Sequence, residues 1–269
     1  RQAPPAPAAA FELAFPIACT PNEDCFIQNL PDRDPGPEAR DASCASLSYD
    51  GHDGTDFALP TLAAMEAGVE VLASAPGIVR GLRDGMPDIS IRAPGAPSLD
   101  GRDCGNGVAL THEGGWETQY CHMKQGSIIV REGQRVTAGE VLGQVGLSGN
   151  TEFPHLHLTV RQDGEWVDPF DPDDRTTCNT PSPPLWAEAL PPAPGGLISI
   201  GLATEVPDYA QVKDGLPPQD SLPGTAPALV LWAQYFGNRA GDRLDLTLIG
   251  PQNTRISETI TLDRTQARG

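Results

Sequence analysis

The stretch Pro154–Val160, with the sequence PHLHLTV, places two histidines and two leucines in alternation. In a β-strand, side chains at positions i and i+2 point to the same face, with Cα atoms about 6.5–7 Å apart. His155 and His157 therefore face one side of a predicted strand, close enough for both to reach one site. Leu156 and Leu158 face the other side, where they predict a core. Taken alone, the two histidines also fit a solvated strand face.

The segment GHDGTDFALP, which begins at Gly51, carries a second pair of candidate ligands, His52 and Asp56. Gly51 and Gly54 permit a tight turn that aims both side chains at one point. An imidazole and a carboxylate are ordinary zinc ligands, although the same letters also fit a turn with an exposed histidine and a helix-capping Asp. Together with His157, they give three donors, two nitrogens and one oxygen, and three is the number of protein ligands at a catalytic zinc.

Two further histidines remain near this set, His155 beside His157 and His122 in the segment TQYCHM. A metal-dependent hydrolase needs a base for the bound water and a group that stabilises the developing oxyanion. The two remaining histidines are candidates for these roles.

These residues resemble the lysostaphin-like (LytM-type) zinc metalloendopeptidase family of bacterial cell walls. That family carries an H-x3-D, a Y-x-H and an H-x-H motif in this order. The connecting segments DCGNGVALTH and REGQRVTAGEVLGQVGLSGN also resemble the family's strand and turn series. The matching motif residues are His52 with Asp56, Tyr120 with His122, and His155 with His157.

The resemblance implies a role for each matching residue. One Zn²⁺ ion would be bound by His52, Asp56 and His157. His122 and His155 would be the catalytic pair, with His155 favoured as the base and the other histidine as the group that stabilises the oxyanion.

The resemblance also indicates residues of the substrate groove and where this chain departs from the family. Phe153, Tyr120 and His112 are groove candidates, although His112 is interpreted first as a structural residue and only second as part of the groove. Phe153 stands where the family usually has small residues, and the loop Asp84–Asp103 is longer than the family norm. These departures leave open which peptide is the substrate.

The implied fold is mainly β, a lysostaphin-like antiparallel β-sheet groove domain of the duplicated hybrid motif type. Alternating and β-branched runs divided by glycines independently predict short strands. A proline-rich segment, TPSPPLWAEALPPAPGG, predicts a stiff linker before a small C-terminal β-sandwich-like module. The predicted parts are an extended, disulfide-stapled segment (1–48), the peptidase domain (49–172), the linker (173–198) and the β module (199–269). The predicted strands of the domain are Val69–Ala73, Ile78–Gly81, Ile89–Arg92, Val108–Thr111, Thr118–His122, Ser127–Val130, Val141–Val145 and His155–Val160.

The charge balance limits the partners of this chain. With 18 basic and 36 acidic residues, the formal net charge is −18, which argues against nucleic acid as a partner. No apolar run approaches the length of a membrane span. The expected partners are peptidoglycan peptides, with a regulatory protein as a further possibility.

Six cysteines without a C-x-x-C motif are consistent with three disulfides and an oxidising compartment, although six buried thiols are the alternative. Cys104 and Cys121 flank a predicted hairpin whose turn is Glu113–Gly115, so they are the best candidate pair. The other four cysteines have three possible pairings. We expect an extracytoplasmic protein, most simply in the periplasm of a Gram-negative bacterium, whose leader has been cleaved.

Two other functions fit parts of the sequence. The chain can be a non-catalytic or latent peptidoglycan-associated regulator or adaptor on the same scaffold, with Asn22 or Asn29 occupying the open zinc position. Alternatively, the V-x-x-G turn series and Lys124 are similar to a biotin- or lipoyl-type carrier, which leaves the clustered histidines unexplained.

Overall fold

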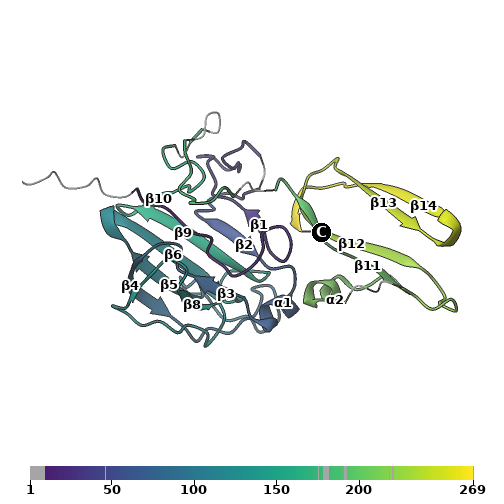
Figure 1. Cartoon of the computed structure of the whole chain (residues 1–269), viewed down its shortest axis with the longest axis horizontal. Coiled ribbons are helices and arrows are strands. Elements are labelled where there is room, and N and C mark those ends of the chain that lie inside the picture. The colour runs from purple at the N-terminus through teal and green to yellow at the C-terminus, as the bar shows by residue number, and fades with distance from the viewer. Residues whose placement is uncertain are drawn as a thin grey trace, which may run out of the picture.

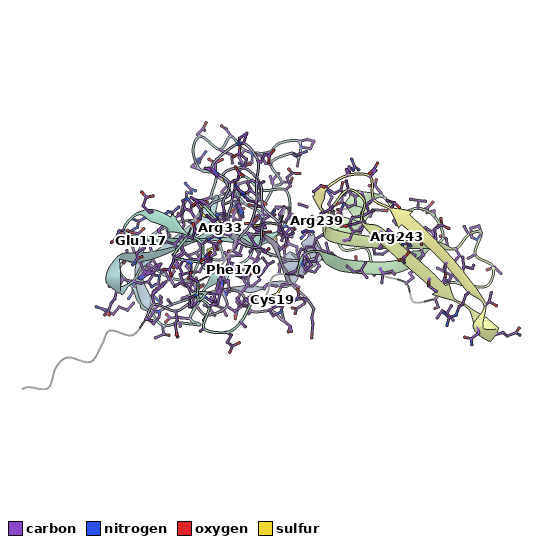
Figure 2. All side chains as sticks on the ribbon, turned by 90° about the horizontal axis from the view of Figure 1, so that it is seen from above. Cys19, Arg33, Glu117, Phe170, Arg239 and Arg243 are labelled. Atoms are coloured by element: carbon purple, nitrogen blue, oxygen red, sulfur yellow. A yellow bond between two sulfur atoms is a disulfide. The ribbon has the colours of Figure 1, made fainter. Side chains whose placement is uncertain are left out.

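A computed structural model describes residues 10–45, 47–174, 176–177, 182–190, 193–217, 219 and 221–268. Residues 1–9, the start of the predicted extended segment, and Cys178 lie outside the described residues. The described chain forms a larger β body and a smaller C-terminal module beside it (Figures 1 and 2).

The larger body is built on one antiparallel sheet in the order β1-β2-β9-β6-β5-β4-β7, with β10 paired to β9. Strands distant in sequence are therefore neighbours, above all β2, β9 and β6 at the centre. A separate pair, β3 with β8, and the short helix α1 complete this body. The bounds are β1 Phe26–Asn29, β2 Thr55–Ala58, α1 Leu62–Ala67, β3 Glu70–Leu72, β4 Gly77–Arg83, β5 Asn106–Thr111, η1 Glu113–Gly115, β6 Trp116–Met123, β7 Arg135–Val136, β8 Val141–Gln144, β9 His155–Gln162 and β10 Glu165–Val167.

The alternating histidines and leucines of β9 lie on opposite faces of the strand, as predicted. Leu156 and Leu158 are fully buried in a core that also contains Phe57 and Tyr120, while His155 and His157 lie on the opposite face of the strand. The strand thus separates the core from the side that carries the imidazoles.

The predicted β5–β6 hairpin has the expected register. Val108 lies opposite Tyr120, and a bulge then shifts the register so that Asn106 lies opposite Met123. Among the described residues, however, neither Ile89–Arg92 nor Ser127–Val130 is a strand. Residues 84–103 contain no helix or strand. Within this loop, the N–H of Ile91 donates a hydrogen bond to the carbonyl of Thr151, in the segment before β9, at 2.9 Å.

The N-terminal segment joins the larger body through strand β1 and through one buried arginine. Arg33, labelled inside the larger body in Figure 2, is 1% exposed. Its guanidinium pairs with Asp168 at 3.3 Å and with Asp171 at 2.9 Å. This segment is therefore packed against the larger body just after β10.

The C-terminal module contains a three-stranded sheet, β11-β12-β15, and a separate hairpin, β13 with β14. The apolar run Leu229–Phe236 corresponds to most of β12, which alternates between buried and half-buried positions because only one of its faces is covered. β14 is exposed along its whole length, so the predicted sandwich core does not extend to it. The bounds are β11 Gly196–Ala203, α2 Tyr209–Asp214, β12 Val230–Asn238, β13 Arg243–Ile249, η2 Pro251–Asn253, β14 Arg255–Thr261 and β15 Gln266–Arg268.

Both α-helices found in the described part of the chain are short, with six residues each, and none of its helices is long and apolar enough to span a bilayer. The architecture is therefore mainly β, as the sequence predicts.

Candidate metal centre

The register of three neighbouring strands brings the candidate ligands together. Asp56 of β2 lies directly opposite His157 of β9, and Cys121 of β6 lies opposite the same histidine on the other side. His52 lies in the turn before β2, where its Nδ1–H donates a hydrogen bond to the carbonyl of Leu30 at 2.8 Å. Asp56 is thus a strand residue rather than part of the predicted turn.

Three side-chain atoms converge on one point. Asp56 Oδ1 lies 3.1 Å from His52 Nε2 and 2.9 Å from His157 Nδ1, and the two nitrogens are 3.1 Å apart. A tetrahedral metal ion with bonds of about 2.0–2.1 Å has ligand atoms about 3.3 Å apart. The spacing therefore fits three ligands of such an ion.

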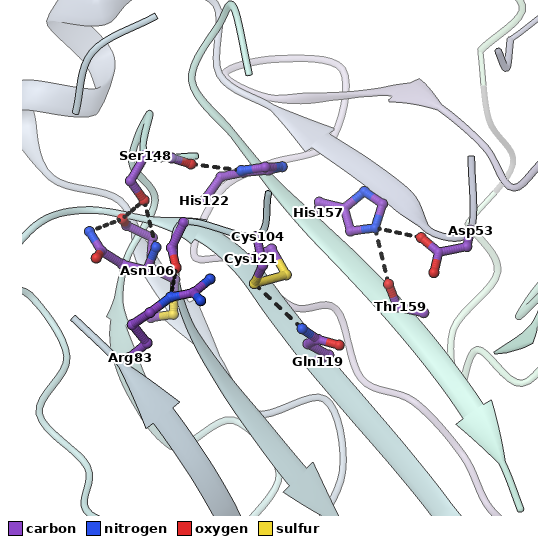
Figure 3. The surroundings of a disulfide bond; sticks show 12 residues. Asp53, Arg83, Cys104, Asn106, Gln119, Cys121, His122, Ser148, His157 and Thr159 are labelled. Atoms are coloured by element: carbon purple, nitrogen blue, oxygen red, sulfur yellow. Dashed lines mark hydrogen bonds and ion pairs between the residues drawn. A yellow bond between two sulfur atoms is a disulfide. The ribbon is translucent and has the colours of Figure 1, made fainter. Parts of the chain in front are cut away.

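The hydrogen bonds on the far side of each imidazole ring determine which ring nitrogen presents a lone pair to the site. A carbonyl only accepts, so His52 carries its proton on Nδ1 and presents the Nε2 lone pair to the site. His157 Nε2 lies 3.0 Å from Thr159 Oγ1 and 3.3 Å from Asp53 Oδ1, contacts that are drawn in Figure 3. Donation to Asp53 leaves His157 Nδ1 as an acceptor. Three acceptors this close repel one another, and a bound cation removes the repulsion.

A glycine makes room for this arrangement. A Cβ atom on Gly54 would lie 2.6 Å from His157 Nε2 and 2.7 Å from the carbonyl oxygen of Leu158. Only glycine allows the turn to approach β9 so closely.

His155 and His122 flank the three donors. His155 Nδ1 lies 3.0 Å from the carbonyl of Phe153, and its Nε2 lies 3.4 Å from Asp56 Oδ1. His122 Nδ1–H donates to the carbonyl of Ser148 at 2.8 Å, which leaves its Nε2 unprotonated in the neutral ring. The two imidazole centroids are 4.7 Å apart.

The backbone of His122 is unusual. Its φ angle is 61°, in the left-handed region that non-glycine residues rarely adopt. The strand bulge near Asn106 and the hydrogen bond from His122 N–H to the carbonyl of Cys104 at 2.8 Å accompany this conformation. Such strained residues occur preferentially at functional sites.

The charges around the site favour an ionised carboxylate and a neutral imidazole. Burial opposes ionisation of Asp56, yet the surrounding His52, His155 and His157 hold the pKa of this carboxyl well below its usual value. Burial lowers the pKa of His122 well below its usual value, and the neighbouring His155 and His157 lower it further.

Cys104 and Cys121 form a disulfide, shown in Figure 3. It links the segment before β5 to β6, next to His122. Another disulfide joins Cys19 to Cys25 in the N-terminal segment.

Two cavities meet at the candidate centre. The larger has a volume of about 570 Å³ and is lined by Asp56, His122, His155 and Phe153, among others. The smaller, of about 250 Å³, is lined by His157, Asp53, Arg161 and again His122. The site therefore lies within a groove that extends to both sides of it.

Two of the groove candidates, Tyr120 and His112, lie outside the groove. Tyr120 is 0% exposed, and its hydroxyl accepts a hydrogen bond from the backbone N–H of Ser74 at 2.7 Å, so it belongs to the core. His112 bonds to the carbonyl of Pro76 and to Thr118 Oγ1, both at 2.8 Å, and lines neither cavity. These contacts fit a structural role for His112.

The asparagines proposed for a latent form lie in different places. Asn29 lies opposite Asp56 in the β1–β2 register and lines the larger cavity. Asn22 lines a separate cavity beside Phe26.

Sequence reasoning missed several groove residues. Tyr49 lines both cavities, and its ring lies 4.4 Å from that of His52. Burial, with Asp56 and Asp53, raises the pKa of its hydroxyl. Tyr49 stands three residues before His52, but a single tyrosine at a segment boundary is no signal by itself. The C-terminal residues of the groove, Gly237, Asn238, Thr265, Gln266 and Ala267, are likewise unpredicted.

Comparison with known proteins gives a consistent result for this region. The model of Peptidase family M23 matches residues 50–169. The DD-carboxypeptidase/endopeptidase Mpg of Neisseria meningitidis serogroup B is 34% identical over 120 residues, which cover 44% of this chain and 22% of that protein. The peptidoglycan DD-endopeptidase ShyA of Vibrio cholerae is 33% identical over 109 residues, covering 40% and 20%. The chain thus covers less than a quarter of these relatives.

Among solved structures, the catalytic domain of the M23 protein EnpA from Enterococcus faecalis is 24% identical and aligns with 61% of this chain and 97% of that chain, with a TM-score of 0.40. The convergent donors lie inside the region that the family model matches. Residues 50–169, which carry these donors, are therefore the part of the chain that is similar to Peptidase family M23.

Proposed function

We propose that this chain is a secreted, zinc-dependent endopeptidase that hydrolyses peptide bonds in the stem or cross-link peptides of peptidoglycan. The observation that carries the proposal is the convergence of His52 Nε2, Asp56 Oδ1 and His157 Nδ1 within 3.1 Å of one another, with two more histidines beside them. Two curated relatives are named as endopeptidases, and one of these names specifies peptidoglycan.

In this proposal, His52, Asp56 and His157 hold one Zn²⁺ ion, a donor set that is common for this metal. When bound, zinc lowers the pKa of a coordinated water to about 7 and polarises a carbonyl. The remaining chemistry falls to residues of the chain.

His155 is the proposed general base. The carbonyl of Phe153 fixes the proton on its Nδ1, so that Nε2 faces Asp56 and can accept a proton from the attacking water. His122, oriented by the carbonyl of Ser148, lies across from His155, and its ring, neutral at first, holds the oxyanion once the proton that His155 takes from the water has passed to its Nε2. A proton accepted by one imidazole is thus available for the leaving amine.

The proposed place of action is the periplasm of a Gram-negative bacterium. Two disulfides in the described part of the chain favour an oxidising compartment.

The test is digestion of purified peptidoglycan by the zinc-loaded protein, with mass spectrometry of the released peptides. Release should be abolished by a chelator, restored by zinc and absent for His157→Ala. His112→Gln is the matched control, since this histidine lies outside the groove, and it should keep wild-type activity. Absence of release from the zinc-loaded, oxidised wild type would contradict the proposal and favour the latent or adaptor function.

A further inference from the structure

The larger half of the groove has walls from three parts of the chain. Next to the donors lie Gln28 and Asn29 of β1, and one wall consists of the segment from Asn150 to Phe153. A further wall comes from the C-terminal module, through Gly237 and Asn238 at the end of β12 and through 265–267 at β15. A module that the sequence separates by a proline-rich segment thus reaches the candidate catalytic site.

Arg268 fixes β15 to the larger body. Its Nε donates to Oε1 of Gln28 at 2.7 Å, and its Nη2 donates to the carbonyl of Leu59 at 2.6 Å. Its guanidinium also lies 5.1 Å from the ring centre of Phe26 and 4.7 Å from that of Phe153. One planar side chain therefore joins the module to β1, to the end of β2 and to the segment before β9.

A second contact fixes β12 independently. The buried rings of Phe26 and Phe236 stack with centroids 4.2 Å apart. Beside them, Gly237 packs so tightly that a Cβ atom would lie 2.9 Å from Leu47 Cδ2. The wall is therefore packed against the larger body at two points.

The chemistry of the walls suits a peptide chain. Five carboxamides line the cavity, and the charged pair there besides Asp56 is Arg92 with Glu152, joined at 2.7 Å. Each carboxamide offers both a donor and an acceptor, as a peptide group requires. The five are Gln28, Asn29, Asn150, Asn238 and Gln266.

Two of these carboxamides have unused hydrogen-bonding capacity. Gln28 uses Oε1 for Arg268, and Asn238 uses Nδ2 for the carbonyl of Arg264, which fixes the orientation of both amides. Within the described structure, the enclosed Nε2 of Gln28 and Oδ1 of Asn238 lack partners. Enclosed polar groups normally find partners. A peptide group carries both kinds of partner, a carbonyl that could accept from Gln28 and an N–H that could donate to Asn238.

β15 is also an edge strand, since its sheet has the order β11-β12-β15. An extended peptide can bind alongside such an edge through main-chain hydrogen bonds. We propose that the C-terminal module is a substrate-binding wall, in which β15, held by Arg268, binds the extended peptide substrate away from the scissile bond. This inference rests on the proposed endopeptidase function and identifies residues that determine its specificity.

The test places a bulky side chain on the wall. Ala267 is exposed and lines the cavity, whereas Ala210 is an exposed alanine of α2 in the same module that does not line it. Ala267→Trp should raise KM for a cross-linked dimer of stem peptides about tenfold, with kcat and zinc content unchanged, because remote binding is lost. Ala210→Trp is the matched control and should keep the wild-type KM within about twofold.

Binding of the same dimer, measured by calorimetry on the zinc-loaded protein, separates this proposal from the proposed function. If the wild type binds the peptide without cleaving it, the endopeptidase proposal fails, and a tenfold weaker affinity of Ala267→Trp still supports the wall. Equal KM and affinity for wild type and Ala267→Trp would overturn the wall. A wild type that neither binds nor cleaves would overturn both.

Discussion

Thr159 holds His157 from the side opposite Asp56, through the 3.0 Å contact between Oγ1 and Nε2. Residues that orient a metal-binding histidine typically contribute about 10–100-fold to metal affinity. Thr159→Val should therefore weaken zinc binding by about tenfold or more, measured by competition with a chromogenic chelator. Thr118→Val, which removes a similar contact to His112, is the matched control and should leave zinc affinity unchanged. Equal affinities of both variants would contradict a positioning role for Thr159.

Asp168 shares the single positive charge of Arg33 with Asp171. Burial raises the pKa of Asp168 to about 7, and the N–H of Phe170 and Arg33 offset part of this effect. In the unfolded chain the pKa is about 3.9. Between these values the folded state keeps a proton that the unfolded chain releases, so this residue makes stability fall as pH rises from about 4 to about 7.

Asp168→Asn keeps the shape of the protonated acid and removes this pH dependence. Its free energy of unfolding should therefore rise relative to wild type by on the order of 1–3 kcal/mol between pH 5 and pH 8. Urea unfolding of both proteins at the two pH values measures the difference. A difference that stays constant with pH would show that Asp168 is already ionised at pH 5.

The ligand types at the site were predictable residue by residue, but their surroundings were not. The i and i+2 spacing of His155 and His157 follows from strand geometry. By contrast, Tyr120 stands two residues before His122, and strand alternation would place both side chains on one face. Tyr120 lies in the core and His122 in the groove because the left-handed backbone of His122 breaks the alternation. The left-handed backbone of His122 depends on the bulge between β5 and β6, which no local pattern indicates.

At the scale of elements, runs with clear alternation or β-branched residues became strands, as β4, β5, β6, β8 and β9 show. The missed strands β1 and β2 are only four residues long and depend on pairing with β9 and with each other. The predicted strand Ile89–Arg92 was wrong: Pro87 and Pro94 on either side cannot donate to a ladder, so the run cannot extend, and none of the described strands pairs with it. Short strands are thus determined by their partners more than by their own residues.

The Cys104–Cys121 disulfide closes a loop with a sequence separation of 17 and braces β6. Cys104→Ser with Cys121→Ser should lower the free energy of unfolding by about 3 kcal/mol, mainly because the unfolded chain gains freedom. It should also weaken zinc binding, since β6 carries His122 and pairs with β9 beside His157.

The control for this variant is Cys19→Ser with Cys25→Ser, which opens a disulfide with a sequence separation of 6 in the N-terminal segment. It should cost about 2 kcal/mol and leave zinc affinity unchanged. Equal zinc affinity for both double variants would mean that β6 needs no brace to hold the site.

At the scale of the whole molecule, the groove is assembled from segments that are far apart in sequence. β1 contributes Gln28, the central strands contribute the donors, and β15 contributes a further wall. Sequence patterns report local periodicity, so they predicted the candidate metal ligands. They could not predict that residues of the C-terminal module line the groove beside them. The contact depends on particular partners, such as Arg268 with Gln28.

The hairpin β13–β14 should be dispensable for this assembly. Its strands join β12 to β15, and Asn238 lies directly opposite Gln266, so the two ends of the hairpin are already adjacent. Replacing residues 241–263 with Asn-Gly, a sequence that suits a two-residue turn, should keep the wall in place, because Arg264, whose carbonyl accepts from Asn238, is retained. We expect a shift of the melting temperature below about 3 °C, because β14 is exposed throughout and buries little surface.

Peptide hydrolysis by this variant should keep a kcat/KM within about twofold of wild type, whereas a chain that ends at Leu190 should show a raised KM. Loss of hydrolysis on replacing the hairpin alone, with Arg268 and zinc content intact, would mean that the hairpin itself binds the substrate.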